Sequence, residues 1–241
     1  MSRLILACEV LKPELELLAS AIADLPEIIY LSQRLHDYPE KLRAGVQEKL
    51  DEIERERPDI DFIIMGYGLC GRGLSGVTTK RATLLYPRLH DCIPLLLGHD
   101  EKNGSLSTRE GTTYWSSPGW LDSFLAEYHL TDARFKKYAE KFGEKRARKM
   151  VQAEDALLGS YRDLCHVQWP GLPGHYREQA KQVAAATKLA YGEKEGSDSY
   201  LRALLTASED EERFLKTRPG QTIDMNTDGE IIVKEAASAS Q

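Results

Sequence analysis

The feature that most constrains this chain is a regular alternation of short apolar runs with amphipathic stretches in its N-terminal part. The runs have the length and residue types of buried strands, and the stretches carry apolar residues three and four positions apart, as helices require. The expected strands are residues 3–8, 27–32, 61–66 and 82–86, and the expected helices are residues 13–24 and 38–57. This order predicts an α/β fold with three layers, in which helices flank a mostly parallel sheet. Right-handed crossovers then bring the carboxyl ends of the strands to one edge.

The second half of the chain is richer in helical patterns. Residues 131–161 are almost continuously helical in pattern, further helices are expected at 175–189 and 198–206, and strands at 165–169, 219–223 and 230–234. We therefore expect residues 1–130 to form a Rossmann-like α/β half that carries the functional site. Residues 131–235 should form a helix-rich half, which could complete the same sheet, and residues 236–241 a flexible tail.

Charge and hydropathy narrow the function classes. The formal net charge is −6, whereas a nucleic-acid-binding protein should present a basic face, so no nucleic-acid partner is expected. The apolar runs are far shorter than the roughly 20 residues that cross a bilayer, so no membrane association is expected either. Glu9 and Lys12 interrupt the first run too early for a signal peptide. These features predict a cytoplasmic protein, in which the four cysteines are thiols or ligands and not disulfides.

Three of the cysteines follow expected strands. Cys8, Cys70 and Cys92 each stand where an apolar run gives way to a loop, so their sulfurs should converge on one edge of the sheet. Thiolates at such an edge suit a tetrahedral zinc ion or a [4Fe–4S] cluster, with His90 or solvent as the fourth ligand. Two alternatives stay open: reactive thiols without a metal, and cysteines that simply pack in the core.

A glycine-rich loop surrounds the second of these cysteines. Gly66, Gly68 and Gly71 match the GxGxxG pattern of dinucleotide-binding proteins, but no clear helix follows the loop. We expect these glycines, with Tyr67, to let the backbone approach a ligand held near Cys70. Tyr114 and its aromatic neighbours could wall the same pocket, although aromatic residues more often lie in the core.

Polar side chains cluster just before the third cysteine. Arg88 could clamp an anionic substrate, and His90 could move a proton or bind the metal. Asp91 could orient the imidazole, and Glu9 could act as a base. The alternative is an ordinary solvated loop. His36 follows the second strand, so the topology brings it to the same edge.

The combined motifs resemble a known family. Ala7-Cys-Glu-Val-Leu, Gly66-Tyr-Gly-Leu-Cys-Gly, Pro87-Arg-Leu-His-Asp-Cys-Ile and Gly111-Thr-Thr-Tyr-Trp together are similar to domain of unknown function 1638 (DUF1638). The residues that match its motifs by position are Cys8, Glu9, Tyr67, Cys70, Arg88, His90, Asp91 and Cys92. Genes of this family often lie beside corrinoid-dependent methyltransferases that act on methylamines, so the resemblance implies a role in one-carbon metabolism.

These expectations define a metal- or iron–sulfur-binding enzyme, or an accessory protein, that takes a small anionic substrate in one-carbon methyl transfer. One alternative is a non-catalytic protein that binds a corrinoid, a metal or a methyltransferase partner. A second alternative is a nucleotide-binding α/β protein.

Overall fold

The computed structural model describes residues 2–98, 112–123, 133–207 and 213–236. The chain forms two compact units: residues 1–106 with 197–241, and residues 107–196. The domain division that we predicted near residue 130 stays a prediction, because neither unit is shown to fold on its own. None of the helices in the described ranges is long and apolar enough to cross a membrane.

The first unit is built on a five-stranded sheet in the order β2-β1-β3-β4-β8. Neighbours among the first four strands are parallel, and β8 is antiparallel to β4 at the edge. The strands are β1 (Ser2–Cys8), β2 (Glu27–Leu31), β3 (Ile60–Gly66), β4 (Thr83–Pro87) and β8 (Phe214–Thr217). The four strands that we predicted in the N-terminal part are confirmed, and so is the mostly parallel α/β class.

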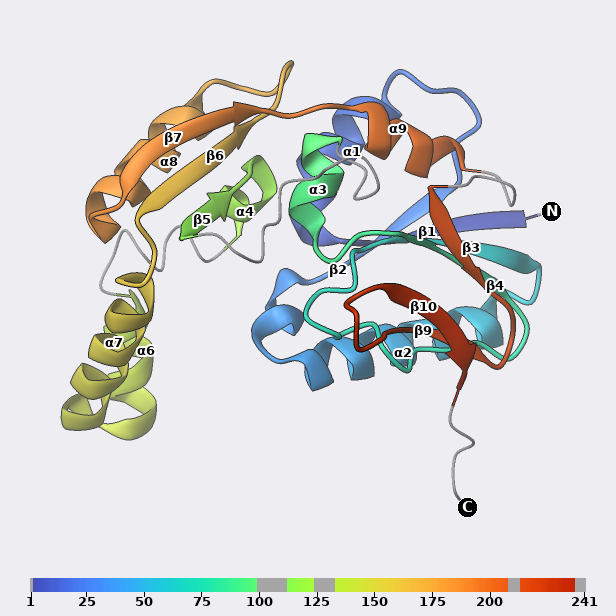
Figure 1. The fold of residues 1–241 in the computed structure, drawn as a ribbon, viewed down its shortest axis with the longest axis horizontal. Helices are drawn as coiled ribbons and strands as arrows, with labels where there is room; N and C mark the ends of the chain where they lie inside the picture. The colour runs from blue at the N-terminus through green and yellow to red at the C-terminus, as the bar shows by residue number, and fades with distance from the viewer. Residues whose placement is uncertain (1, 99–111, 124–132, 208–212, 237–241) are drawn as a thin grey trace. The chain divides into compact units, whose positions relative to one another are not determined.

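Helices cover both faces of this sheet, so the unit has three layers (Figure 1). On one side lies α2, and on the other lie α1, α3 and α9 (Figure 1). Their bounds are α1 (Lys12–Ala19), α2 (Pro39–Glu56), α3 (Cys92–Leu97) and α9 (Ser199–Thr206), and two 3₁₀ helices are η1 (Glu9–Leu11) and η2 (Gln33–Asp37). The hairpin of β9 (Gln221–Met225) and β10 (Ile231–Glu235) shares the α2 side of the sheet.

The core under α2 follows from two periodicities. Alternate residues of a strand face the same side of a sheet, so Leu4, Leu6 and Cys8 of β1 share one face. The helix contributes residues three or four positions apart, as predicted: Leu42, Val46, Leu50 and Ile53. Strand and helix residues belong to one buried cluster. The last residue of β1 in this cluster, Cys8, is therefore already at the carboxyl edge of the sheet.

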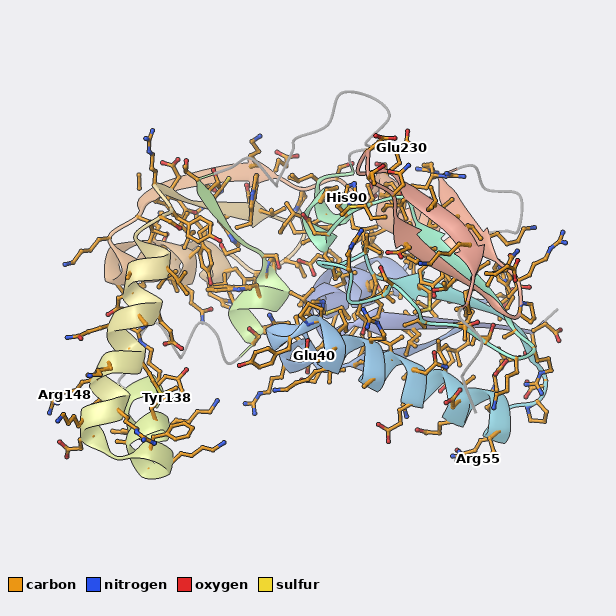
Figure 2. The ribbon with its side chains drawn as sticks, turned by 60° about the horizontal axis from the view of Figure 1, so that its bottom comes forward. Glu40, Arg55, His90, Tyr138, Arg148 and Glu230 are labelled. Carbon is orange, nitrogen blue, oxygen red and sulfur yellow. The ribbon has the colours of Figure 1, made fainter. Side chains whose placement is uncertain are left out.

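The second unit has its own parallel sheet in the order β5-β6-β7. Its strands are β5 (Thr113–Ser116), β6 (Asp163–Gln168) and β7 (Ala190–Glu195), and its helices are α4 (Pro118–Asp122), α6 (Ala133–Phe142), α7 (Glu144–Leu158) and α8 (His175–Thr187). The helical pattern at 131–161 is divided at Gly143, which has a φ of +78°. Across this break, Tyr138 of α6 donates a hydrogen bond to Glu154 of α7, and Figure 2 shows the two helices side by side.

Candidate thiol site

The predicted convergence of strand ends is present in the first unit. Cys8 is the last residue of β1, Cys70 lies in the loop after β3, and Cys92 is the first residue of α3, which follows β4. The register pairs Ala7 with Gly66, so β1 and β3 reach the carboxyl edge together. The site is therefore positioned by adjacent parallel strands, as the alternation of elements predicted.

Backbone hydrogen bonds tie the loop after β3 to the loop after β4. Leu69 N–H donates to the carbonyl oxygen of Leu89, and Cys70 N–H donates to that of His90, both at 2.8 Å. This pairing brings the sulfur atoms of Cys70 and Cys92 to 3.9 Å from each other. Two thiols, one in the loop after β3 and one at the first residue of α3, are thus held as a pair by the backbone.

We predicted that the glycines of this loop let the backbone approach a ligand. At two of these positions, contacts within the protein itself explain why the residue is glycine. A Cβ at Gly68 would lie 2.6 Å from the Cα of Asp91, and a Cβ at Gly66 would lie 2.5 Å from the Cβ of Ala7. Real Cβ atoms do not approach so closely, so both positions need glycine for packing of the protein on itself. Residues 67–82 contain no helix, and the structural context of a dinucleotide fingerprint is missing here.

Cys70 adopts an unusual backbone conformation. Its φ is +50°, in the left-handed region that side chains other than glycine rarely adopt, and Gly71 follows at +62°. Strain of this kind costs about 1–3 kcal/mol and persists where the surroundings impose it, most often at functional sites. The loop thus accepts strain at the position that carries a thiol beside Cys92.

Cys8 has a different close neighbour. Its buried sulfur lies 4.0 Å from Nδ1 of His36 in η2, and that Nδ1 also lies 3.2 Å from the carbonyl oxygen of Gln33. The His36 ring stacks against Tyr67, with ring centroids 6.1 Å apart and planes inclined by 15°. His36, which sequence analysis placed only at the same edge, is therefore in contact with the thiol site.

The thiols of Cys8 and Cys70 resist ionisation. Burial, followed by the charge of Cys92, raises the pKa of Cys8 well above its usual value. The hydrogen bond with Cys92, followed by burial, does the same to the pKa of Cys70. These thiols are protonated at neutral pH, whereas reactive cysteines carry lowered pKa values. The raised pKa values lower the reactivity of Cys8 and Cys70, and the alternative of reactive thiols without a metal stays a prediction.

Tyr67 is buried beside the same sulfurs. It is 1% exposed, and its hydroxyl has no hydrogen-bond partner among the residues that the structure describes. Burial first, and then the charges of Cys8, Cys70 and Cys92, raise the pKa of Tyr67 well above its usual value. The hydroxyl is therefore a neutral hydrogen-bond donor within the electrostatic reach of all three thiols.

The predicted proton-transfer residues have other contacts. Asp91 caps α3, because its Oδ1 accepts a hydrogen bond from Ile93 N–H at 2.8 Å. Glu9 is exposed, and its Oε2 accepts a hydrogen bond from Gln33 N–H at 3.4 Å. Arg88 and His90 are partly buried, and Figure 2 places His90 in the loop after β4. The catalytic roles of these four residues stay predictions.

Tyr114 belongs to the second unit. Its ring packs edge-on against Trp120, with centroids 5.6 Å apart, and lies 5.2 Å from the ring of Tyr161. These contacts are those of an aromatic cluster around β5. The predicted pocket-wall role of Tyr114 stays a prediction, since the structure describes each unit by itself.

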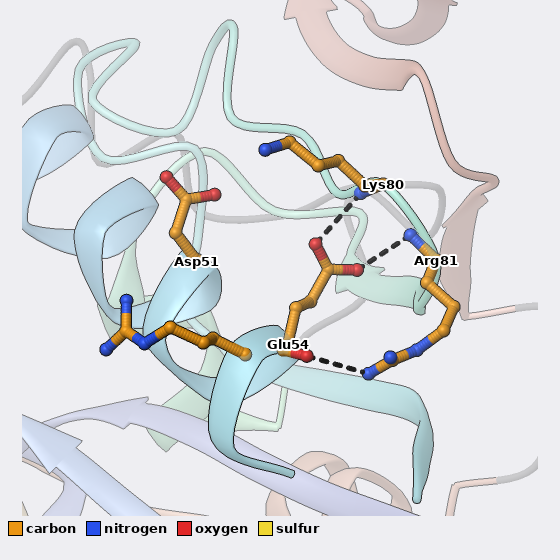
Figure 3. Close-up of a pocket in the computed structure, with 5 residues that line it drawn as sticks. Asp51, Glu54, Lys80 and Arg81 are labelled. Atoms are coloured by element: carbon orange, nitrogen blue, oxygen red, sulfur yellow. Dashed lines mark hydrogen bonds between the residues drawn. The ribbon is translucent and has the colours of Figure 1, made fainter. Parts of the chain in front are cut away.

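A surface pocket lies away from the thiols, at the C-terminal part of α2 (Figure 3). Its central residue, Glu54, accepts backbone N–H hydrogen bonds from Lys80, Arg81 and Ala82 at 3.0, 2.7 and 2.9 Å. Burial alone would raise the pKa of Glu54, but these hydrogen bonds outweigh it and lower the pKa. The carboxylate thus fixes the segment that leads into β4, which is a structural role.

The fold and site define an α/β protein with a pair of partly buried thiols, Cys70 and Cys92, and a buried Cys8 at the carboxyl edge of a parallel sheet. The family model "Protein of unknown function (DUF1638)" matches residues 30–205, and the chain belongs to this family. The match includes Cys70 and Cys92 and begins after Cys8. No curated protein and no solved structure gives a significant match to the chain.

Proposed function

We propose that Cys70 and Cys92, together with Cys8, bind a thiophilic metal ion, and that zinc is the first candidate. The observation that carries the proposal is the 3.9 Å separation of the Cys70 and Cys92 sulfurs. Two thiolates on one tetrahedral zinc ion, with bonds of about 2.3 Å, would lie about 3.8 Å apart. The existing pair already has the spacing of two zinc ligands.

The remaining ligands require side-chain movement. In the described ranges, no three His, Cys, Asp or Glu side chains form a group that could hold a metal ion as they stand. Cys8 lies at the same edge of the sheet, and its side chain would have to move to add a third sulfur. The Cys70–Cys92 pair should therefore contribute most to affinity, and Cys8 should contribute less.

His36 is a candidate for the fourth ligand beside the predicted His90. A carbonyl oxygen only accepts hydrogen bonds, so Nδ1 of His36 carries the proton if it bonds to Gln33 at 3.2 Å. That tautomer presents Nε2 as the ligand atom, the arrangement that metal-binding histidines commonly adopt.

Metal binding also accounts for the protonated thiols. Burial raises the pKa of Cys8 and the hydrogen bond with Cys92 raises that of Cys70, and repulsion between ionised sulfurs adds to both. A divalent cation compensates this repulsion and displaces the thiol protons. Affinity should consequently fall as the pH is lowered.

The chemistry that we propose is soft-ligand or Lewis-acid catalysis in one-carbon metabolism, as the family resemblance implies. A bound zinc ion would activate a thiol or polarise a substrate atom. Arg88 would bind an anionic substrate, and Glu9 or His90 would move a proton. A [4Fe–4S] cluster, and a non-catalytic role in holding a corrinoid, a metal or a methyltransferase partner, are the competing proposals.

The test is metal analysis of protein purified without oxygen, with zinc and iron measured together. We expect about one zinc per chain in the wild-type protein and a large loss in Cys70→Ser and Cys92→Ser. Cys165→Ser is the matched control, because Cys165 is a buried free thiol in the sheet of the second unit. Iron in place of zinc would support the cluster. Folded Cys70→Ser protein with an undiminished metal content would refute the ligand assignment.

A further inference from the structure

The hydroxyl of Tyr67 is a polar group that is buried in the hydrophobic core. Tyr67 follows the last residue of β3 and belongs to the buried cluster under α2, together with Leu6 and Cys8. Its side chain is 1% exposed, and no described residue accepts or donates a hydrogen bond to its oxygen. A buried hydroxyl without a partner destabilises a folded protein, and natural proteins rarely retain one without a reason.

The surroundings of this hydroxyl are the thiol site itself. Cys8, Cys70 and Cys92 all lie within electrostatic reach of it, and the His36 ring stacks on the phenol ring. Nevertheless, none of the three sulfurs lies within hydrogen-bonding geometry of the hydroxyl. The hydroxyl therefore lies near the thiols without a hydrogen bond to any of them. This is the arrangement expected if a ligand atom binds between the hydroxyl and the sulfurs.

We propose that the Tyr67 hydroxyl donates a hydrogen bond to the charged atom of a small anionic ligand bound at the thiol site. This inference rests on the proposed metal site and adds the substrate class to it. An anion is favoured because a phenol O–H in a buried setting is a strong donor toward a charged acceptor. An anion would also complete a metal held by the three thiolates alone, where it takes the fourth position in place of a histidine.

Tyr86 provides a matched control for this residue. It lies in the neighbouring strand β4, belongs to the same buried cluster and is also 1% exposed. Its hydroxyl likewise has no partner among the described residues, but burial alone perturbs it and no cysteine charge acts on it. Both variants therefore remove a hydroxyl from the same core. Tyr67→Phe removes it near the thiols, and Tyr86→Phe removes it away from them.

The experiment compares the cobalt-substituted wild-type, Tyr67→Phe and Tyr86→Phe proteins, with azide as the anionic probe followed by visible absorption. We expect Tyr67→Phe to weaken azide binding about tenfold and to change metal affinity by less than about threefold. Tyr86→Phe should leave both affinities at the wild-type value. The metal-free forms of both variants should unfold at or above the wild-type temperature, because each loses an unsatisfied hydroxyl.

The outcomes separate this inference from the proposed function. If the wild-type protein binds no cobalt, the metal site itself has failed. If it binds cobalt and Tyr67→Phe takes up azide as tightly as wild type, only the inference is overturned. It is also overturned if Tyr67→Phe weakens metal binding as much as azide binding, because the hydroxyl would then donate its hydrogen bond to a cysteine sulfur. A third contradicting result is that Tyr86→Phe weakens azide binding as much as Tyr67→Phe does.

Discussion

The α-carbon of Gly68 faces the backbone of Asp91 so closely that a Cβ on Gly68 would lie 2.6 Å from the Asp91 Cα. This contact allows the loops after β3 and β4 to pair through their backbones. The pairing in turn sets the spacing of Cys70 and Cys92. The glycine at this position thus allows the two segments to approach closely, and this approach brings their thiols together.

Substituting Gly68 should therefore damage both the fold and the site. We expect Gly68→Ala to lower the free energy of unfolding by roughly 1–3 kcal/mol, because the added methyl group meets rigid backbone. Metal content should fall as well, since the loops must separate. Gly174→Ala is the control, because a Cβ there has no atom within 4 Å. Urea denaturation and metal analysis test this, and equal behaviour of the two variants would contradict it.

The left-handed backbone of Cys70 makes a second prediction. At most loop positions alanine is at least as stabilising as glycine, but at a φ of +50° the order should reverse. We expect metal-free Cys70→Gly to be more stable than metal-free Cys70→Ala by about 1 kcal/mol. Denaturant unfolding of the two variants measures this difference directly. Greater stability of the alanine variant would show that Cys70 is not held in the strained conformation.

The segment that leads into β4 should depend on the charge of Glu54. Its carboxylate accepts N–H bonds from Lys80, Arg81 and Ala82, and its pKa is lowered. A lowered pKa means that this stability is present above the unfolded pKa and is lost as the pH falls through the folded one. We expect Glu54→Gln to cost about 2 kcal/mol at neutral pH.

The matched control for Glu54 is Glu56→Gln, an exposed residue of the same helix whose carboxylate pairs with Arg55. Thermal unfolding at pH 7 and at pH 3 should show the loss only for Glu54→Gln, and mainly at pH 7. An equal loss at both pH values would mean that the ionised carboxylate is not what fixes the segment.

A buried histidine should make the second unit sensitive to acid. His166 of β6 is 1% exposed, and its Nδ1 lies 3.3 Å from the Ser116 hydroxyl. Burial lowers the pKa of His166 to about 4. Between about pH 6.5 and 4 the unfolded chain takes up a proton that the folded chain does not, so stability falls by about 3 kcal/mol as the pH drops through this range.

The variant His166→Gln cannot titrate and should lose less stability than the wild type over the same pH range. His175→Gln serves as the control, because His175 is exposed on α8. Guanidinium unfolding at several pH values tests the difference. Parallel pH profiles for wild type and His166→Gln would contradict the assignment.

Elements with a strong periodicity could be predicted from the sequence. The helix α2 follows from apolar residues that recur three and four positions apart, and the strands β1 and β3 follow from short continuous apolar runs that are buried on both faces. The strand β7 has no such signal, because Glu193, Lys194 and Glu195 are exposed and Gly192 adds no side chain. Edge strands of this kind pair through their backbones, so their residue types do not reveal that they form strands.

The candidate site could be predicted only at the level of the sheet edge. Topology alone placed Cys8, Cys70 and Cys92 together, since parallel strands end on one side. The contact of His36 with Cys8, and the backbone pairing that sets the Cys70–Cys92 spacing, depend on loop conformations. These involve residues far apart in the chain, which local patterns do not encode.

The most direct test of the account is X-ray absorption at the zinc edge of the anaerobically purified protein, which counts the atoms bound to the metal. We predict three sulfur ligands at about 2.3 Å and one lighter ligand in the wild type, and one sulfur fewer in any Cys70→Ser protein that retains zinc. A metal surrounded only by nitrogen and oxygen atoms would contradict the central claim that these cysteines form a metal site.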